Sequence, residues 1–162
     1  MSAPPAYQPT APPAGLRVPC SANSAFPTYD LVGEGSFMDK DASPVWVASA
    51  LVGNSVHPCK VARGVCMYSY SGSEKHHKGR YDILPLTEQM EWVAAEGGHL
   101  PKGRRPVEGG FEEGGQHLFH ALATIDGVQV PGKTAEHLRG ANFGYGGVEH
   151  VKQSGYQVLC WR

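Results

Sequence analysis

The segment Val107–Leu159 reads VEGGFEEGGQHLFHALATIDGVQVPGKTAEHLRGANFGYGGVEHVKQSGYQVL and decides the fold, because the chain contains its pattern twice. The earlier copy, Val32–Leu84, reads VGEGSFMDKDASPVWVASALVGNSVHPCKVARGVCMYSYSGSEKHHKGRYDIL. Lys60 corresponds to Lys133, 73 positions later, whereas the closing leucines of the copies are 75 positions apart, so copy two carries two extra residues after its lysine. Two copies are too few for a solenoid, and the duplication instead predicts two units related by a pseudo-twofold axis.

Both copies alternate short runs of strand-forming residues with turns that contain glycine. Val45–Leu51 is rich in strand formers and is followed by Gly53-Asn54. In copy two, Leu118–Ile125 is followed by Asp126-Gly127, a dipeptide that is typical of tight hairpins. Further strands are expected at Met67–Tyr70, Arg80–Leu84, Glu91–Ala95, Phe143–Tyr145 and Gly155–Leu159. Since no segment keeps a helical period over three turns, the sequence predicts an all-β fold of antiparallel strands.

The N-terminal segment differs in composition from the remainder of the chain. Residues 1–19 contain six prolines, a composition that prevents a helix and leaves too little apolar mass for independent folding. We therefore expect residues 1–19 to form an extended tail, with docking to a partner or a second copy as its alternative role. Residues 20–162 are expected to form one compact domain, with repeats at about 27–84 and 101–159 joined by a strand at 86–96.

The overall composition argues against several classes of partner. A net charge of −1 and an isoelectric point near 6.7 provide no electrostatic basis for binding nucleic acid or an anionic membrane. No apolar run approaches the ~18 residues of a membrane-spanning helix. The first residues lack the basic start and apolar stretch of a secretory signal, so we expect a cytoplasmic protein, with non-classical secretion left open.

The cysteines and histidines do not form metal-binding patterns. No two of the four cysteines form a C-x-x-C pair, and reduced, buried thiols are expected of a cytoplasmic protein. These cysteines are Cys20, Cys59, Cys66 and Cys160. On a strand, His117 and His120 would point to opposite faces, whereas a zinc site requires convergent ligands. We therefore expect neither a metal nor another cofactor.

Both copies resemble the DM9 repeat. Over copy two and the residues before it, the resemblance rests on Trp92, Gly97–Pro101, Val107–Gly110, Leu118–Ala123, Pro131–Lys133, Tyr145–Glu149 and Tyr156–Leu159. Copy one shows the same order, with Pro58-Cys59-Lys60 in place of Pro-Gly-Lys. The resemblance implies a compact all-β unit of two interlocked repeats that forms a homodimer. It also implies a lectin, not an enzyme, that binds mannose or mannose-rich glycans without a metal and has a role in innate immunity.

The resemblance further implies that an aspartate and the motif lysine, 21 positions later, hold the sugar. In copy one these residues are Asp39 and Lys60, and in copy two they are Glu112 and Lys133. The chemistry suits a sugar, because a carboxylate accepts hydrogen bonds from two neighbouring hydroxyls and an ammonium offers three donors. The two acids are 73 positions apart, as the two lysines are, so the match is also internal to this chain.

Several alternatives remain open from the sequence. If Gly53-Asn54 is a hairpin turn, Lys60 faces Val47, so the loop 39–44 must curl back over the strand to bring Asp39 to Lys60. Asp41 is an alternative to Asp39. Glu112 is one methylene longer than aspartate, which leaves the second site open. Alternative readings are surface ion pairs, a protein-interaction or defence-associated module, and a glycoside hydrolase with Asp39 and Glu112 as acid and base. Duplication opposes the hydrolase, which needs unlike settings for its two acids.

Overall fold

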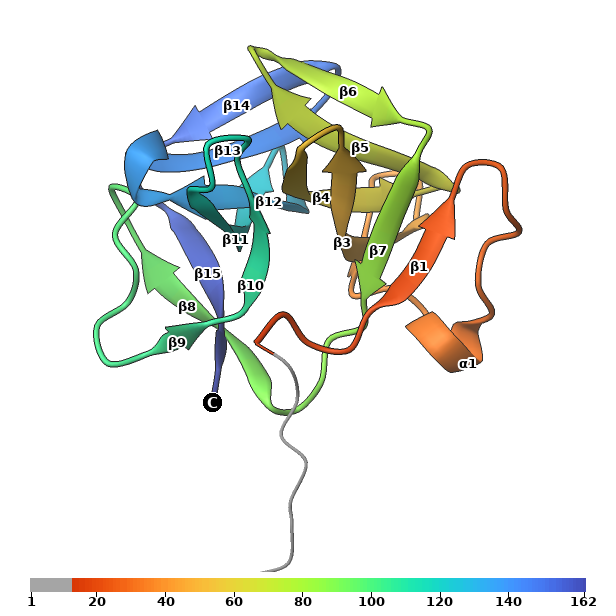
Figure 1. Cartoon of the computed structure of the whole chain (residues 1–162), viewed down its shortest axis with the longest axis horizontal. Coiled ribbons are helices and arrows are strands. Elements are labelled where there is room, and N and C mark those ends of the chain that lie inside the picture. Colours follow the sequence, from red (N-terminus) through yellow and green to blue (C-terminus); the bar gives the residue numbers. More distant parts are fainter. Residues whose placement is uncertain (1–12) are drawn as a thin grey trace, which may run out of the picture.

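The computed structural model describes residues 13–162, and it confirms an all-β fold (Figure 1). The strands are β1 (Val18–Ser21), β2 (Phe37–Met38), β3 (Pro44–Val52), β4 (Ser55–Ala62), β5 (Val65–Tyr70), β6 (Ser73–His77), β7 (Arg80–Leu84), β8 (Met90–Ala95), β9 (Arg105–Pro106), β10 (Glu108–Phe111), β11 (His117–Ile125), β12 (Val128–Ala135), β13 (Gly140–Tyr145), β14 (Val148–Lys152) and β15 (Tyr156–Trp161). Two short helices, α1 (Tyr29–Val32) and η1 (Glu136–Leu138), interrupt the strands. No helix within residues 13–162 is long and apolar enough to cross a membrane.

The two central hairpins form where the turn residues predict them. β3 and β4 pair around Gly53-Asn54, and β11 and β12 pair around Asp126-Gly127. Asp126 and Gly127 both have positive φ angles, 53° and 78°, which matches the right-handed twist of the flanking strands. The strand expected at Glu91–Ala95 is present as β8. The sequence patterns did not identify β6 and β14, because these strands are largely polar.

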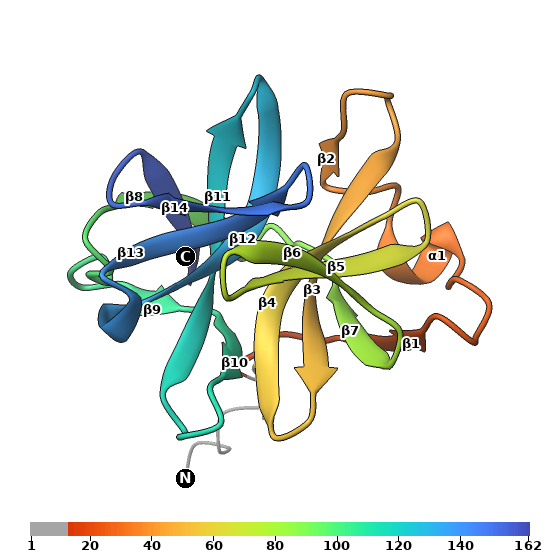
Figure 2. The ribbon, with the colours of Figure 1, turned by 90° about the horizontal axis from the view of Figure 1, so that it is seen from above.

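Equivalent strands of the two repeats occupy equivalent positions when the sheet is followed inward from its two ends. The strand order runs β1-β7-β3-β4-β5-β6 in one half and continues β14-β13-β12-β11-β15-β8 in the other. The halves meet where Ser73 pairs with Val148, and these residues occupy the same position in the two copies. Figure 2 shows the halves on opposite sides of this contact. The predicted pseudo-twofold relation is therefore confirmed.

Strand pairing also interlocks the repeats, since one repeat contributes a strand to the other. Phe111 of β10, in copy two, pairs with Val56 of β4, in copy one. At the outer ends of the sheet, β8 pairs along β15 in the way that β1 pairs along β7. The strand expected as a linker thus corresponds to β1. The β10–β4 pair places the residues after Phe111 beside the β3–β4 hairpin, which determines the second site.

The proline-rich segment is not a free tail over residues 13–19, contrary to the prediction. Val18 and Pro19 belong to β1, and the guanidinium of Arg17 donates to Ser49 Oγ and to the Glu108 carbonyl, both at 2.8 Å. Arg17 also contacts His120 Nε2 at 3.0 Å. The composition argument failed here because strand pairing of Val18 and Pro19 with β7, together with the hydrogen bonds of the partly buried Arg17, orders the segment without much apolar mass. The predicted tail residues 1–12 lie outside the described residues.

A core lies between the strands of each repeat, and a third group of apolar residues joins the two. The two repeat cores are built around Trp46, Val61 and Ile83, and around Val130, Phe143 and Val158. The joining group consists of Val47, Leu84, Met90, Val107, Leu159 and Trp161. The Trp161 indole N–H donates to the Pro13 carbonyl at 3.2 Å, so the last strand anchors the first described residues. All four cysteines are buried and free, as expected.

Candidate functional site

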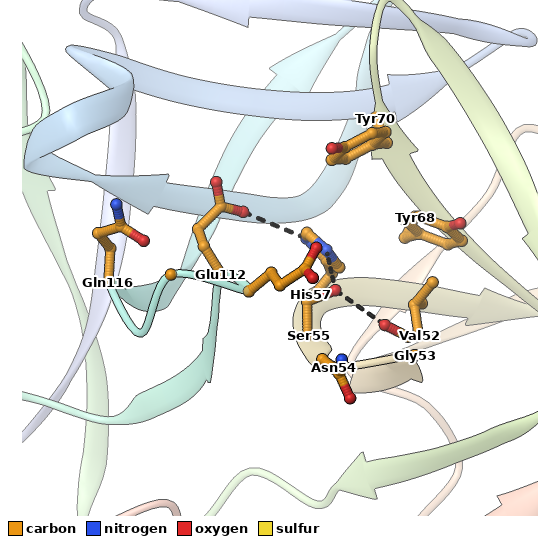
Figure 3. A pocket seen from close by; sticks show the side chains of 11 residues that line it. Val52, Gly53, Asn54, Ser55, His57, Tyr68, Tyr70, Glu112 and Gln116 are labelled. Carbon is orange, nitrogen blue, oxygen red and sulfur yellow. Dashed lines mark hydrogen bonds and ion pairs between the residues drawn. The ribbon is translucent and has the colours of Figure 1, made fainter.

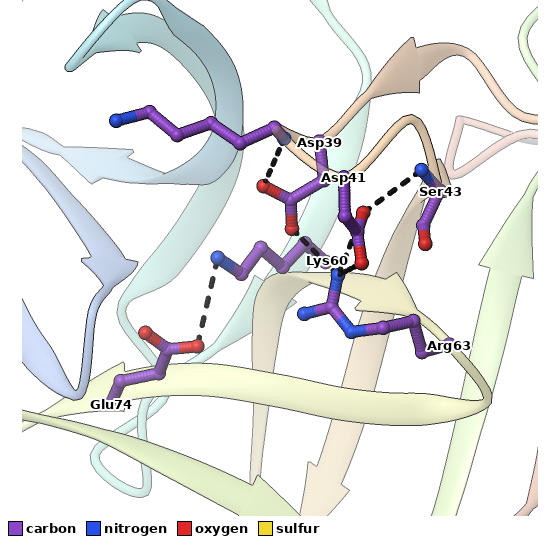
Figure 4. Close-up of polar contacts among 7 residues, drawn as sticks. Asp39, Asp41, Ser43, Lys60, Arg63 and Glu74 are labelled. Carbon is purple, nitrogen blue, oxygen red and sulfur yellow. Dashed lines mark hydrogen bonds and ion pairs between the residues drawn. The ribbon is translucent and has the colours of Figure 1, made fainter.

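The first predicted pair lies where the loop after β2 turns back over β4. Lys60 is in register with Val47, as the hairpin turn predicted. The Asp39 N–H donates to the Ser43 carbonyl at 2.9 Å, which closes the loop and carries Asp39 over the strand. Figure 4 shows the Lys60 ammonium beneath this loop, on the same side as the Asp39 carboxylate. The loop 39–44 therefore curls back over the strand, as the pairing of Asp39 with Lys60 requires.

Asp39 is held in its charged form by its neighbours. Its carboxylate accepts hydrogen bonds from the Lys40 N–H at 2.8 Å and from Arg63 Nη1 at 3.0 Å. Burial alone would raise the pKa of Asp39, but these hydrogen bonds and the nearby positive charges of Arg63 and Lys60 lower it. A carboxylate has about four acceptor positions, so positions remain for a ligand after these two bonds.

Lys60 is almost wholly buried, with 6% of its surface exposed. Its Nζ lies 3.6 Å from Glu74 Oε1 and 5.2 Å from the ring centre of Tyr145, which belongs to the other repeat. Burial lowers the pKa of Lys60, whereas the charges of Glu74 and Asp39 oppose that effect. The ammonium is thus positioned by one carboxylate and one aromatic face, and neither contact uses all its donors.

Asp41, the alternative acid, lies at the surface of the same loop. It accepts from the Ser43 N–H at 2.9 Å and pairs with Arg63 at 3.3 Å. Its pKa is lowered chiefly by the Ser43 hydrogen bonds, and more weakly by Arg63. Because the side chain of Asp39 is 14% exposed and that of Asp41 is 54% exposed, the geometry favours Asp39 as the acid beside Lys60.

The second predicted pair is brought together differently. Glu112 follows β10, and its N–H donates to the Gln116 carbonyl at 2.8 Å, so the loop 112–116 is closed. Its carboxylate lies 3.2 Å from His137 Nε2 through one oxygen and 3.9 Å from His57 Nδ1 through the other. His137 thus contacts Glu112 much as Arg63 contacts Asp39.

Lys133 is buried behind His57. Its Nζ donates to the Ser69 carbonyl at 2.7 Å and to His57 Nδ1 at 3.1 Å, and it lies 5.5 Å from the ring centre of Tyr70. Burial lowers the pKa of Lys133, and the Glu112 charge opposes this. Lys133 therefore faces a histidine and a tyrosine of the other repeat, and its donors are more fully used than those of its counterpart.

His57 is neutral and has a defined tautomer. An ammonium only donates, so His57 Nδ1 accepts from Lys133 and the ring proton resides on Nε2. Nε2 lies 3.0 Å from Ser55 Oγ, which in turn donates to the Val52 carbonyl at 2.9 Å. Burial, reinforced by the charge of Lys133, lowers the pKa of His57 to about 4. The 3.9 Å approach of Glu112 is therefore not an ion pair at neutral pH.

Glu74 and Glu149 form hydrogen bonds between the two repeats, close to Lys60 and Lys133. The Glu74 carboxylate accepts from the Gly147 N–H at 3.2 Å, and the Glu149 carboxylate accepts from the Gly72 N–H at 3.1 Å. Backbone hydrogen bonds from Glu74 to Gly147 and from Glu149 to Gly72, of 3.1 and 3.0 Å, complete the contact. This contact fixes the β5 and β13 hairpins, which carry the tyrosines that the lysines face. The shared spacing of Glu74 and Glu149 in the two copies was the only sequence signal for them.

A cavity of about 580 Å³ opens beside Glu112 (Figure 3). It is lined by Val52, Gly53, Asn54, Ser55, His57, Tyr68, Tyr70, Glu112, Glu113, Gly114 and Gln116. The aromatic side chains come from copy one and the acidic loop from copy two. Among residues 13–162, no group of three or more histidine, cysteine, aspartate or glutamate side chains could hold a metal ion.

Comparison with known proteins supports the family resemblance. The family model described as DM9 repeat matches residues 39–160. The solved structure of the nematode sperm cell motility protein MFP2B superposes with a TM-score of 0.64 at 19% sequence identity, covering 98% of this chain. The chain spans 49% of the length of that structure. A search of curated proteins finds no match. Because the family model covers most of the chain and the fold agrees with it, this protein belongs to the DM9-repeat family.

Proposed function

We propose that this protein is a lectin that binds mannose-type glycans without a metal ion, through two sites per chain. The observation that supports the proposal is the repeated cluster of an acid, a lysine and a tyrosine. In each cluster the acid and lysine come from one repeat and the tyrosine from the other: Lys60 lies 5.2 Å from the ring centre of Tyr145, and Lys133 lies 5.5 Å from that of Tyr70.

The groups in the Asp39 cluster complement the surface of a sugar. The carboxylate keeps free acceptor positions for two neighbouring hydroxyls, and the Lys60 ammonium keeps donors for their lone pairs. The ring of Tyr145 offers an apolar face to the C–H face of the sugar. The charged groups are already held by Arg63 and Glu74, so binding does not require the long side chains to be ordered.

Titration calorimetry with methyl α-mannoside tests the proposal. We expect Asp39→Asn and Lys60→Met each to weaken binding at the first site by about tenfold or more, because a hydrogen bond to a charged group contributes about 1.5–3 kcal/mol. Lys102→Met, which alters an exposed lysine in the loop before β9, is the matched control and is expected to leave binding unchanged. Unchanged affinity in both site variants, or no hit for the wild type on a glycan array, would refute the proposal and favour a protein-interaction module.

The geometry favours binding over hydrolysis. A glycosidase places two carboxyl groups on either side of one bond, roughly 5–10 Å apart. Here Asp39 pairs with Arg63 and Glu112 with His137, in separate clusters related by the pseudo-twofold axis. The proposal extends to a homodimer, which would double the number of sites and allow branched glycans to be bridged. Light scattering of the purified protein measures that assembly directly.

A further inference from the structure

We propose that the two sites differ in the length of glycan they accept: the Glu112 cavity binds an oligosaccharide of two or three hexose units, whereas the Asp39 cluster binds a single terminal sugar. Tyr68, Tyr70 and the open gap between Gly53 and Glu113 determine this preference. The inference rests on the proposed lectin function and assigns a substrate length to each site.

The Glu112 cavity has one polar and one aromatic wall. Glu112 and Gln116 provide the polar wall, from the loop after β10. The rings of His57 and Tyr68 are stacked with their centres 5.5 Å apart, and the ring of Tyr70 meets that of His57 at 73° with a centre-to-centre distance of 5.7 Å, so the opposite wall contains three neighbouring rings. Carboxylates bind hydroxyls and aromatic faces pack against C–H groups, so these walls complement the two kinds of surface of a saccharide.

The size of the cavity exceeds the need of one sugar. Cavities of about 300–1,000 Å³ hold ligands of drug size, and a single hexose is smaller than those. The volume of about 580 Å³ beside Glu112 lies within that range. The ligand that fills it therefore extends beyond one ring.

The corresponding positions of the Asp39 cluster are closed by a bridge. Lys40, in the loop after β2, pairs with Asp126 in the turn between β11 and β12. At the Glu112 cavity the equivalent residues, 73 positions away in each case, are Glu113 and Gly53, and both line the open space. Glycine has no side chain to reach across, so the gap stays open there.

The aromatic wall is also specific to the Glu112 cavity. The counterpart of His57 is Val130, and that of Tyr68 is Phe143. Val130 is as buried as His57, with 1% against 2% exposed, but it is not aromatic. Phe143 is fully buried in the core of copy two, whereas Tyr68 is only partly buried and lines the cavity. The Asp39 cluster thus keeps the acid, lysine and tyrosine but has no equivalent polar aromatic wall.

The test builds the Lys40–Asp126 bridge of the Asp39 cluster into the Glu112 cavity. The double variant Gly53→Asp/Glu113→Lys places the Lys40–Asp126 pair at the cavity, and position 53 tolerates aspartate because its φ of 57° matches the 53° of Asp126. In a Lys60→Met background, which reports the Glu112 site alone, calorimetry compares methyl α-mannoside with α-mannotriose. We expect the trisaccharide to bind about tenfold or more tightly, and the double variant to bring the ratio of the two affinities close to one.

A reciprocal variant, which removes the bridge from the Asp39 cluster, tests the inference independently of whether the first double variant folds. In a Lys133→Met/Glu112→Gln background, Lys40→Glu/Asp126→Gly opens the Asp39 cluster and is expected to raise the trisaccharide-to-monosaccharide ratio there. Equal affinity of both sugars for the Glu112 site, or a ratio unaffected by either bridge variant, overturns the inference while the lectin function stands. Absence of binding to every saccharide overturns both.

Discussion

Acidification from pH 7 to pH 4 is expected to destabilise the fold through His57. Burial and the neighbouring Lys133 lower the pKa of this histidine from the ordinary 6.5 to about 4. Below pH 6.5 His57 binds a proton in the unfolded chain, whereas in the folded chain it does so only near pH 4. The free energy of unfolding therefore falls as the pH falls through this window. At 1.36 kcal/mol for each pKa unit, the loss from His57 amounts to about 3 kcal/mol. His120 acts in the same direction, because burial and Arg17 hold its pKa well below 6.5.

Urea unfolding at steps of pH between 7 and 4, followed by tryptophan fluorescence, measures this effect. His57→Gln removes the titration, so its free energy of unfolding is expected to fall by about 3 kcal/mol less than that of the wild type over this window. His117→Gln alters an exposed histidine on β11 and is the matched control, whose pH dependence is expected to parallel the wild type.

A pH dependence of stability in His57→Gln equal to that of the wild type would refute the reasoning. It would mean that the His57 ring takes up its proton at about the same pH in the folded protein as in the unfolded chain, so that neither burial nor Lys133 lowers its pKa. An NMR titration of the His57 ring provides the direct measurement, with a midpoint expected near pH 4.

Three further predictions concern stability and binding. Gly132→Ala places a Cβ 2.5 Å from the ring of Phe143, so we expect its free energy of unfolding to fall by about 1–3 kcal/mol, as measured by urea denaturation. Arg17→Met leaves Ser49 and His120 without a buried donor, and a loss of about 2 kcal/mol is expected; thermal unfolding with an unchanged midpoint would contradict this. Mannoside binding is expected to persist in EDTA, since the proposed contacts use only carboxylate, ammonium and aromatic groups; loss of affinity would indicate a metal-dependent site.

The sequence by itself determined the duplication, the all-β class and the central hairpins. Turn dipeptides such as Asp126-Gly127 act within a few residues, so their effect is readable locally. The equal spacing of Asp39 with Lys60 and of Glu112 with Lys133 selected residues that the structure places in two corresponding clusters. The register of Lys60 with Val47 also followed from the turn alone.

Only the tertiary structure decided what completes each cluster. Tyr145 reaches Lys60 because the polar strands β6 and β14 pair at the pseudo-twofold axis, where Ser73 lies opposite Val148. These strands are about 75 positions apart in the chain, and no local pattern predicts that they pair. The position of His57 between Lys133 and Glu112 likewise depends on the pairing of β10 with β4. The copies also differ in how equivalent residues pack: Phe143 is buried in the core of copy two, whereas its counterpart Tyr68 lines a cavity. The residues that differ between the copies, and the long-range packing that brings them to one place, therefore distinguish the two sites.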